Sequence, residues 1–155
     1  MATKPLAQDQ STATEFDLGS VTALATAAAH EHVRRMTGRQ EGEALTDADE
    51  RYFTYAWLKA LAASLGELHG SIKAICLIPQ VEGDDDLVDE VVILAKTNNA
   101  ALALIAKSVE AQYDRVRGDA GLSRRLCIRH LPDANDALGR SVMNSLCRPP
   151  LQVWP

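Results

Sequence analysis

Apolar residues recur at every third or fourth position in the first part of the chain, the spacing of an amphipathic helix. One such stretch covers residues 18–37 and is followed by Gly38, a residue suited to the end of a helix. A second begins at Thr46, where Asp49 gives a pattern resembling a capping box, and runs towards Gly70. The inward-facing residues predicted for the first helix are Val21, Leu24, Ala25, Ala28, His32, Val33 and Met36. Those predicted for the second are Phe53, Ala56, Trp57, Ala60, Leu61, Ser64, Leu65 and Leu68.

The pattern changes after residue 70, where short runs are apolar on both faces and rich in β-branched residues. Such runs indicate strands buried on both sides, and they cover residues 71–78, 87–97 and 125–131. Helical spacing returns over about 99–117 and 134–148. The predicted order of elements is therefore α-α-β-β-α-β-α.

This order predicts an α/β (α+β) domain in which helices pack on a small mixed sheet of three strands. A short loop joins the first two strands, which favours antiparallel pairing, and a helix joins the second to the third, which favours parallel pairing. We expect a single domain over residues 16–148, preceded by a disordered tail at 1–15. Residues 149–155 form a separate apolar tail, because Pro149 and Pro150 prevent the last helix from continuing.

Aromatic side chains supply candidate partner-binding residues in two places. Tyr52 and Tyr55 lie on the outward side of the second helix, where they form either an anchor for a partner or a second buried face. Trp154 in the apolar tail must be covered by its own domain or by a second copy of the chain. The alanine-rich first helix offers a face for close packing, so we expect a homodimer.

Charge narrows the class of partner. The chain of 155 residues has a formal net charge of −5, which argues against nucleic acid as a partner. Acidic residues gather at 82–90 with no cation among them, and arginines gather at 115–129. We expect the acidic loop to steer a protein with a basic surface, through Glu82, Asp84, Asp85, Asp86 and Asp89. The predicted function is a non-enzymatic interaction module of the inhibitor, immunity or adaptor type.

The same loop supports an alternative function. Asp84 and Asp86 stand two residues apart beside a strand, an arrangement of carboxylates that suits Mg²⁺. Strand, acidic loop and strand over residues 72–94 faintly resemble the nucleotidyltransferases, a likeness that implies a metal-dependent phosphotransfer enzyme centred on these two aspartates. In that family a Gly-Ser turn follows the first strand, whereas Gly70-Ser71 precedes it here. No other metal site and no organic cofactor is predicted.

Histidines add two weaker signals. His30 and His32 are two residues apart on a predicted helix, so they point to opposite sides and do not share a metal ion. Arg124 and Arg125 precede His130 at a spacing that resembles the Arg-His motif of HEPN-type ribonucleases. That family carries its motif on a helix, whereas residues 125–131 are predicted here as a strand.

The cysteines and the N-terminus bear on the compartment. Cys76, Cys127 and Cys147 are far apart and odd in number, which points to a reducing environment. Cys76 and Cys127 fall in predicted strands, where we expect small buried hydrophobic side chains. Residues 1–20 lack the apolar centre of a secretory signal, and no apolar run approaches the ~20 residues that span a bilayer. We therefore expect a cytoplasmic protein without a membrane partner.

Overall fold

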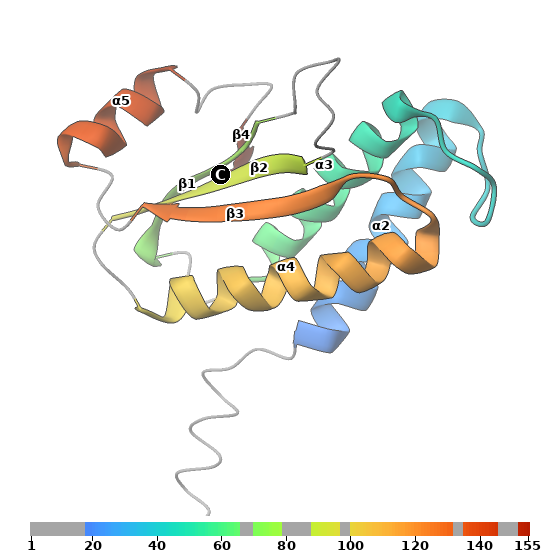
Figure 1. Cartoon of the computed structure of the whole chain (residues 1–155), viewed down its shortest axis with the longest axis horizontal. Coiled ribbons are helices and arrows are strands. Elements are labelled where there is room, and N and C mark those ends of the chain that lie inside the picture. Colours follow the sequence, from blue (N-terminus) through green and yellow to red (C-terminus); the bar gives the residue numbers. More distant parts are fainter. Residues whose placement is uncertain (1–17, 66–69, 79–87, 97–99, 132–134, 146–151) are drawn as a thin grey trace, which may run out of the picture.

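A mixed sheet with helices packed on it forms the body of the protein (Figure 1). The structure, a computed structural model, describes residues 18–65, 70–78, 88–96, 100–131, 135–145 and 152–155. The helices within these residues are α2 (Leu18–Thr37), α3 (Asp47–Ala63), α4 (Ala100–Ala120) and α5 (Ala137–Ser145). The strands are β1 (Ile72–Ile78), β2 (Val88–Ala95), β3 (Arg125–Leu131) and β4 (Gln152–Trp154). The predicted mixed α and β class is confirmed.

The strands follow the order β3-β2-β1-β4 across the sheet. As predicted, β1 and β2 are antiparallel, and β2 and β3, which α4 connects, are parallel. The prediction of a three-stranded sheet is wrong by one strand, because β4 pairs antiparallel with β1. β4 has only three residues, too few to reveal a period in the sequence.

β4 comes from the segment predicted as an apolar tail. Trp154 lies opposite Ile75 of β1 in the sheet register. Val153 is buried, and the half-buried Trp154 packs against the main core. This part of the tail is therefore covered by its own chain. The disordered tail predicted for residues 1–15 lies outside the described residues.

The main core lies between one face of the sheet and the helices α2, α3 and α4. Trp57 and Phe53 of α3 are fully buried there, as their place on the apolar stripe predicts. The Trp57 ring meets the Tyr113 ring edge-on, with 4.8 Å between ring centroids. The Tyr113 hydroxyl is 2.9 Å from Thr54 Oγ1, and burial is the main cause that raises the pKa of Tyr113. α3 is thus the central helix of the core.

The helix boundaries follow the sequence signals in part. Thr46 and Asp49 form the predicted capping box at the start of α3. α3 then ends at Ala63, several residues before Gly70, with Ser64 as its C-cap. Gly38, directly after α2, has a φ of +83°, which favours glycine.

The predicted inward face of α2 is partly wrong. Leu24 and Met36 are 67 % and 52 % exposed. Ala25 and Val33 are buried as predicted, and Thr22 and Ala29 are buried with them. α2 packs chiefly on α3, and small residues on the contact face let the two helices approach closely. Leucine and methionine are thereby turned to the other side of α2.

A second buried cluster lies on the opposite face of the sheet, around Ala74, Cys76, Val92 and Leu94. Figure 1 shows α5 on the side of the sheet away from α4. Cys76 is fully buried, as predicted, but it is one half of a disulfide bond. A disulfide at Cys76 does not agree with the reducing environment expected from the cysteine pattern, whereas the half-buried Cys127 is a free thiol. Cys147 lies outside the described residues.

β3 forms one edge of the described sheet. The backbone N–H of Ile128 in this strand donates a hydrogen bond to the carboxylate of Glu110 on α4. No described strand pairs with this N–H group. The carboxylate of the half-buried Glu110 takes the place of a strand partner.

Candidate functional site

The acidic stretch at 82–90 divides into two parts. Glu82, Asp84, Asp85 and Asp86 lie outside the described residues, so their steering role and the alternative Mg²⁺ site stay predictions. Asp89 lies in β2, is 2 % exposed, and has Oδ1 3.2 Å from Nη1 of Arg124. The Asp89 charge is therefore held inside the protein instead of facing a partner. The reason is the parallel pairing of β2 with β3, which brings Asp89 and Glu90 beside the start of the arginine-rich strand β3.

Arg124 is the centre of a buried charged cluster. Its Nη2 lies 3.2 Å from Oδ2 of Asp47, in the first turn of α3. Glu50 Oε1 accepts hydrogen bonds from the backbone N–H groups of Ser123 and Arg124, at 2.9 Å and 3.2 Å. Burial acts to lower the pKa of Arg124, but the hydrogen bond to Asp47 and the charges of Asp89, Asp47 and Glu50 outweigh it and raise the pKa. The cluster joins α3 to the sheet and is structural.

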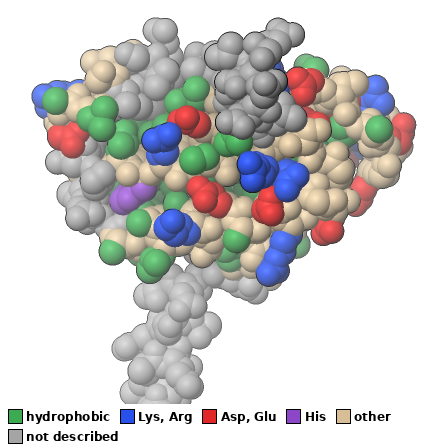
Figure 2. Space-filling model, in the orientation of Figure 1, with side chains coloured by type: hydrophobic (Ala, Val, Ile, Leu, Met, Phe, Trp, Pro, Cys, Tyr) green, Lys and Arg blue, Asp and Glu red, His purple; other side chains and the backbone are tan. Residues whose placement is uncertain are grey.

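Charges on the outer side of β2 and β3 also pair. Nε of Arg129 lies 3.1 Å from Oε2 of Glu90 on the neighbouring strand. Figure 2 shows acidic and basic side chains interspersed over the side of the molecule that carries β3 and α4. Residues 82–90 contain no cation of their own, but Asp89 and Glu90 pair with arginines from elsewhere in the chain. These pairs could not be predicted from the local sequence, because Arg124 and Arg129 lie about 35–40 residues further along the chain.

The predicted aromatic residues lie on two elements. Tyr52 of α3 is 38 % exposed, and its ring lies edge-on to His32 of α2 with 5.9 Å between centroids. Tyr55 is half-buried against the core, and the Lys59 ammonium is 5.7 Å from the centre of its ring. Trp154 lies on β4, at the sheet edge. A partner-binding role for all three stays a prediction.

The histidine and arginine signals do not form a ribonuclease or metal site. Arg124 and His130 are six positions apart, about 20 Å of extended chain at 3.3 Å per residue. The Arg124 guanidinium is engaged by carboxylates, and burial lowers the pKa of His130. His30 contacts Glu41 and His32 contacts Tyr52, so the two histidines of α2 diverge. Among the described residues, no group of three or more His, Cys, Asp or Glu side chains could hold a metal ion.

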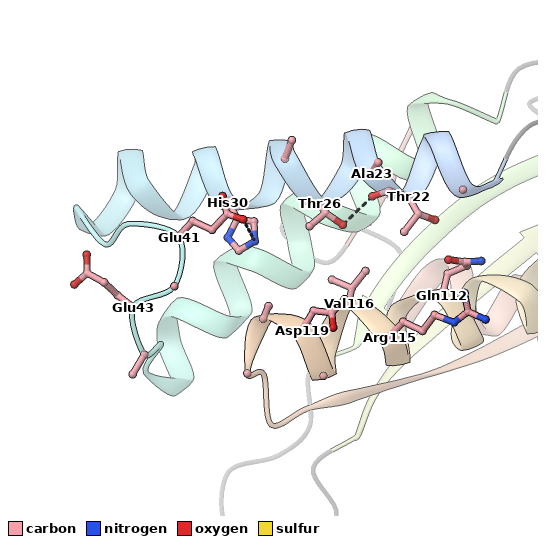
Figure 3. A pocket seen from close by; sticks show the side chains of 17 residues that line it. Thr22, Ala23, Thr26, His30, Glu41, Glu43, Gln112, Arg115, Val116 and Asp119 are labelled. Atoms are coloured by element: carbon pink, nitrogen blue, oxygen red, sulfur yellow. Dashed lines mark hydrogen bonds and ion pairs between the residues drawn. The ribbon is translucent and has the colours of Figure 1, made fainter.

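A groove of about 980 Å³, which we call the α2–α4 groove, lies in the described surface (Figure 3). One wall is α2 from Gly19 to His30, and the opposite wall is the C-terminal half of α4 with Gly121. The turn 41–44 closes one end. The polar residues along the groove are Thr22, Thr26, His30, Glu41, Glu43, Gln112, Arg115 and Asp119.

Local structure positions the acidic end of the groove. Gly42 has a φ of +93°, and it lets residues 40–44 turn back towards α2. Glu43 faces the turn itself, because its Oε1 accepts a hydrogen bond from the backbone N–H of Gln40 at 2.7 Å. Glu41 points to α2, where its Oε1 lies 3.8 Å from Nε2 of His30. The Glu41 side chain is 78 % exposed, so its charge remains accessible.

The other end of the groove contains a buried hydroxyl without a partner. Thr26 Oγ1 is satisfied, since it donates to the carbonyl of Thr22 at 2.8 Å and accepts from Nε1 of Trp57 at 3.1 Å. Thr22 is 7 % exposed, and its Oγ1 has no hydrogen-bond partner among the described residues. Figure 3 shows the Thr22 side chain on the side of α2 that faces Gln112 and Arg115 of α4.

No pattern in the sequence predicted this groove. Its residues come from α2, from the turn 41–44 and from α4, and none of these segments carries a motif. The nearest available signals were Gly42 and Gly121, whose positive φ values mark tight turns beside the groove. Residues that converge from distant segments are visible only once the fold is known.

The chain has no match among family models, curated proteins or solved structures. None of the described helices is long and apolar enough to cross a membrane. Function therefore has to be inferred from the chemistry of the chain's own residues.

Proposed function

We propose that the protein is a non-enzymatic interaction module that binds an extended segment of a partner protein in the α2–α4 groove. The observation that carries this proposal is the form of the groove. α2 borders it from Gly19 to His30, which is about 17 Å of helix at 1.5 Å per residue. An extended chain rises about 3.3 Å per residue, so about five residues fit along this wall. Glycine and alanine at Gly19, Ala23 and Ala27 allow a backbone to approach closely.

The charges at the closed end favour a basic side chain on the partner. Glu41 and Asp119 are both exposed there, on the turn and on α4. Rim charges of this kind raise the rate of association more than the affinity. If residues 82–86 steer the same partner, their negative charges would also raise the rate of association. An inhibitor, an immunity protein and an adaptor all fit this kind of binding.

The proposal does not depend on the compartment. A cytoplasmic location and a homodimer stay predictions. The disulfide at Cys76 weighs against a strongly reducing compartment, where such bonds are rare.

A library of random eight-residue peptides displayed on phage tests the proposal. Selected peptides are synthesised, and their binding is measured by fluorescence anisotropy against three forms of the full chain. Ala27→Trp places an indole in the groove, whereas Ala103→Trp places one on an exposed position of α4 outside it. We expect the selected peptides to contain a basic residue, to bind the unmodified protein and Ala103→Trp alike, and to bind Ala27→Trp at least tenfold more weakly.

Two results would contradict the proposal. One is a library that yields no peptide with saturable binding to the unmodified protein. The other is a set of peptides that bind Ala27→Trp and Ala103→Trp equally well, because such peptides would lie outside the groove. Circular dichroism of both variants checks that each indole leaves the fold intact.

A further inference from the structure

The open end of the α2–α4 groove gathers hydrogen-bond donors. Thr22 supplies a hydroxyl that is buried and has no partner among the described residues. Gln112 and Arg115 are three residues apart on α4, so they lie on the same face of that helix. No ion pair or hydrogen bond of the Gln112 or Arg115 side chain occurs within the described part of the chain, although Asp119 is one turn away from Arg115.

These three side chains are chemically matched to an anion with two oxygens. A hydroxyl offers one donor, an amide NH₂ group two, and a guanidinium five in a planar fork. Arginine in particular binds carboxylates through two parallel hydrogen bonds. A buried hydroxyl without a partner costs stability, and a ligand oxygen that accepts from it removes that cost on binding.

We propose that Thr22, Gln112 and Arg115 form a subsite for a carboxylate, supplied by an acidic side chain of the bound segment. This inference rests on the proposed function and adds to it a required spacing of charged residues in the partner segment. Thr22 and His30 are eight residues apart on α2, about 12 Å at 1.5 Å per residue. An extended segment covers that distance in three to four residues. The partner segment therefore carries an acidic residue three or four positions from its basic residue.

A small probe tests the subsite without any selected peptide. The probe is N-acetyl-aspartate N-methylamide, and its uncharged match is the asparagine compound. Each is titrated into ¹⁵N-labelled full-length protein, and the resonances of the Gln112 side-chain amide and of Arg115 Nε–H are followed. We expect saturable shifts with the aspartate compound and none with the asparagine compound.

Two variants with a matched control make the assignment specific. Arg115→Gln should weaken binding of the aspartate compound about tenfold or more, since it removes a charged donor. Arg51→Gln removes an exposed arginine of α3 that lies outside the groove, and it should leave binding unchanged. Thr22→Val keeps the shape of the side chain without the hydroxyl, and it should weaken binding severalfold.

Equal shifts with the two compounds, no saturation, or undiminished binding to Arg115→Gln would each overturn the subsite. Its failure can be told apart from failure of the proposed function. Peptides that bind in the groove and tolerate replacement of their acidic residue by an amide would refute the subsite alone. Arginine-dependent binding of the aspartate compound, together with an empty peptide selection, would refute the proposed function alone.

Discussion

Two aspartates at the same distance from one guanidinium provide a sharp test of what burial does to a charge pair. Asp89 and Asp47 each lie 3.2 Å from Arg124. The Asp89 side chain is 3 % exposed, whereas that of Asp47 is 65 % exposed. Replacement by asparagine keeps the shape of each side chain, removes its charge and leaves one carbonyl oxygen as an acceptor beside an NH₂ donor. We therefore compare Asp89→Asn with Asp47→Asn.

The expected magnitudes differ several-fold. Asp89→Asn leaves the buried Arg124 without its buried counterion, and breaking such a pair costs about 3–5 kcal/mol. Asp47→Asn removes a solvent-exposed partner, which contributes about 0–1 kcal/mol. Asp47 also lies in the first turn of α3, where loss of a negative charge adds about 0.3–1 kcal/mol. A domain of ordinary stability, about 5–15 kcal/mol, would be strongly affected only by the first change.

Urea unfolding followed by tryptophan fluorescence and by circular dichroism measures both free energies. The double variant Asp89→Asn/Arg124→Met supplies the control. If the cost of Asp89→Asn comes from an uncompensated buried cation, removal of that cation should recover much of the lost stability. The unfolding transitions followed by fluorescence and by circular dichroism should coincide, because the free energies can be compared only if unfolding is two-state.

Equal and small losses for the two single variants would refute this reasoning. Such a result would mean that water reaches Arg124 and that Asp89 lies near the surface, as expected of a steering residue. A double variant no more stable than Asp89→Asn would also count against it, because the arginine would then be harmless alone.

Three further outcomes are expected. Trp57→Ala should lower the free energy of unfolding by about 3–5 kcal/mol, because Trp57 is fully buried. Tyr52→Ala, on the exposed side of the same helix, should lower it by less than about 1 kcal/mol. Denaturant titration of the two variants compares these free energies. Removal of residues 152–155 should lower the melting temperature, since β4 buries Val153 against the core. An unchanged melting temperature would contradict the pairing of β4 with β1. Sedimentation equilibrium of the full-length and truncated chains tests the predicted homodimer. Burial lowers the pKa of His130 below its ordinary value of 6.5, so the folded state binds a proton more weakly than the unfolded state. Stability should therefore fall as the pH drops below about 6.5, and His130→Gln should reduce this slope in urea midpoints measured across that range.

Much of the fold could be predicted because local signals agree with the packing. β3 covers residues 125–131 as expected, and Gly38 follows α2 where the chain needs a positive φ. The capping box of Thr46 and Asp49 depends on residues three apart, so it is visible in the sequence. Runs that are apolar on both faces predicted β1 and β2. The short loop between β1 and β2 predicted antiparallel pairing, and the helix between β2 and β3 predicted parallel pairing.

The misplaced features have a common physical cause, which is contact between distant segments. Asp89 looks like one more acid of a charged loop until the register of β2 with β3 places it beside Leu126, with Arg124 just before that strand. Leu24 fits a helical stripe as well as Thr22 does, and only the close packing of α2 on α3 decides which one is buried. The α2–α4 groove and its unpartnered hydroxyl arise in the same way.

The Glu110 carboxylate at the β3 edge of the described sheet bears on how copies of this protein behave when they are crowded. An edge strand with unpaired backbone groups is a template on which further strands add, and long stacks of that kind become fibres. In β3 the N–H of Ile128 is already engaged by Glu110, and the strand carries exposed arginines at Arg125 and Arg129. An incoming strand would have to displace the carboxylate and bring charges close together. The edge of β3 is thereby protected against the growth of aggregates.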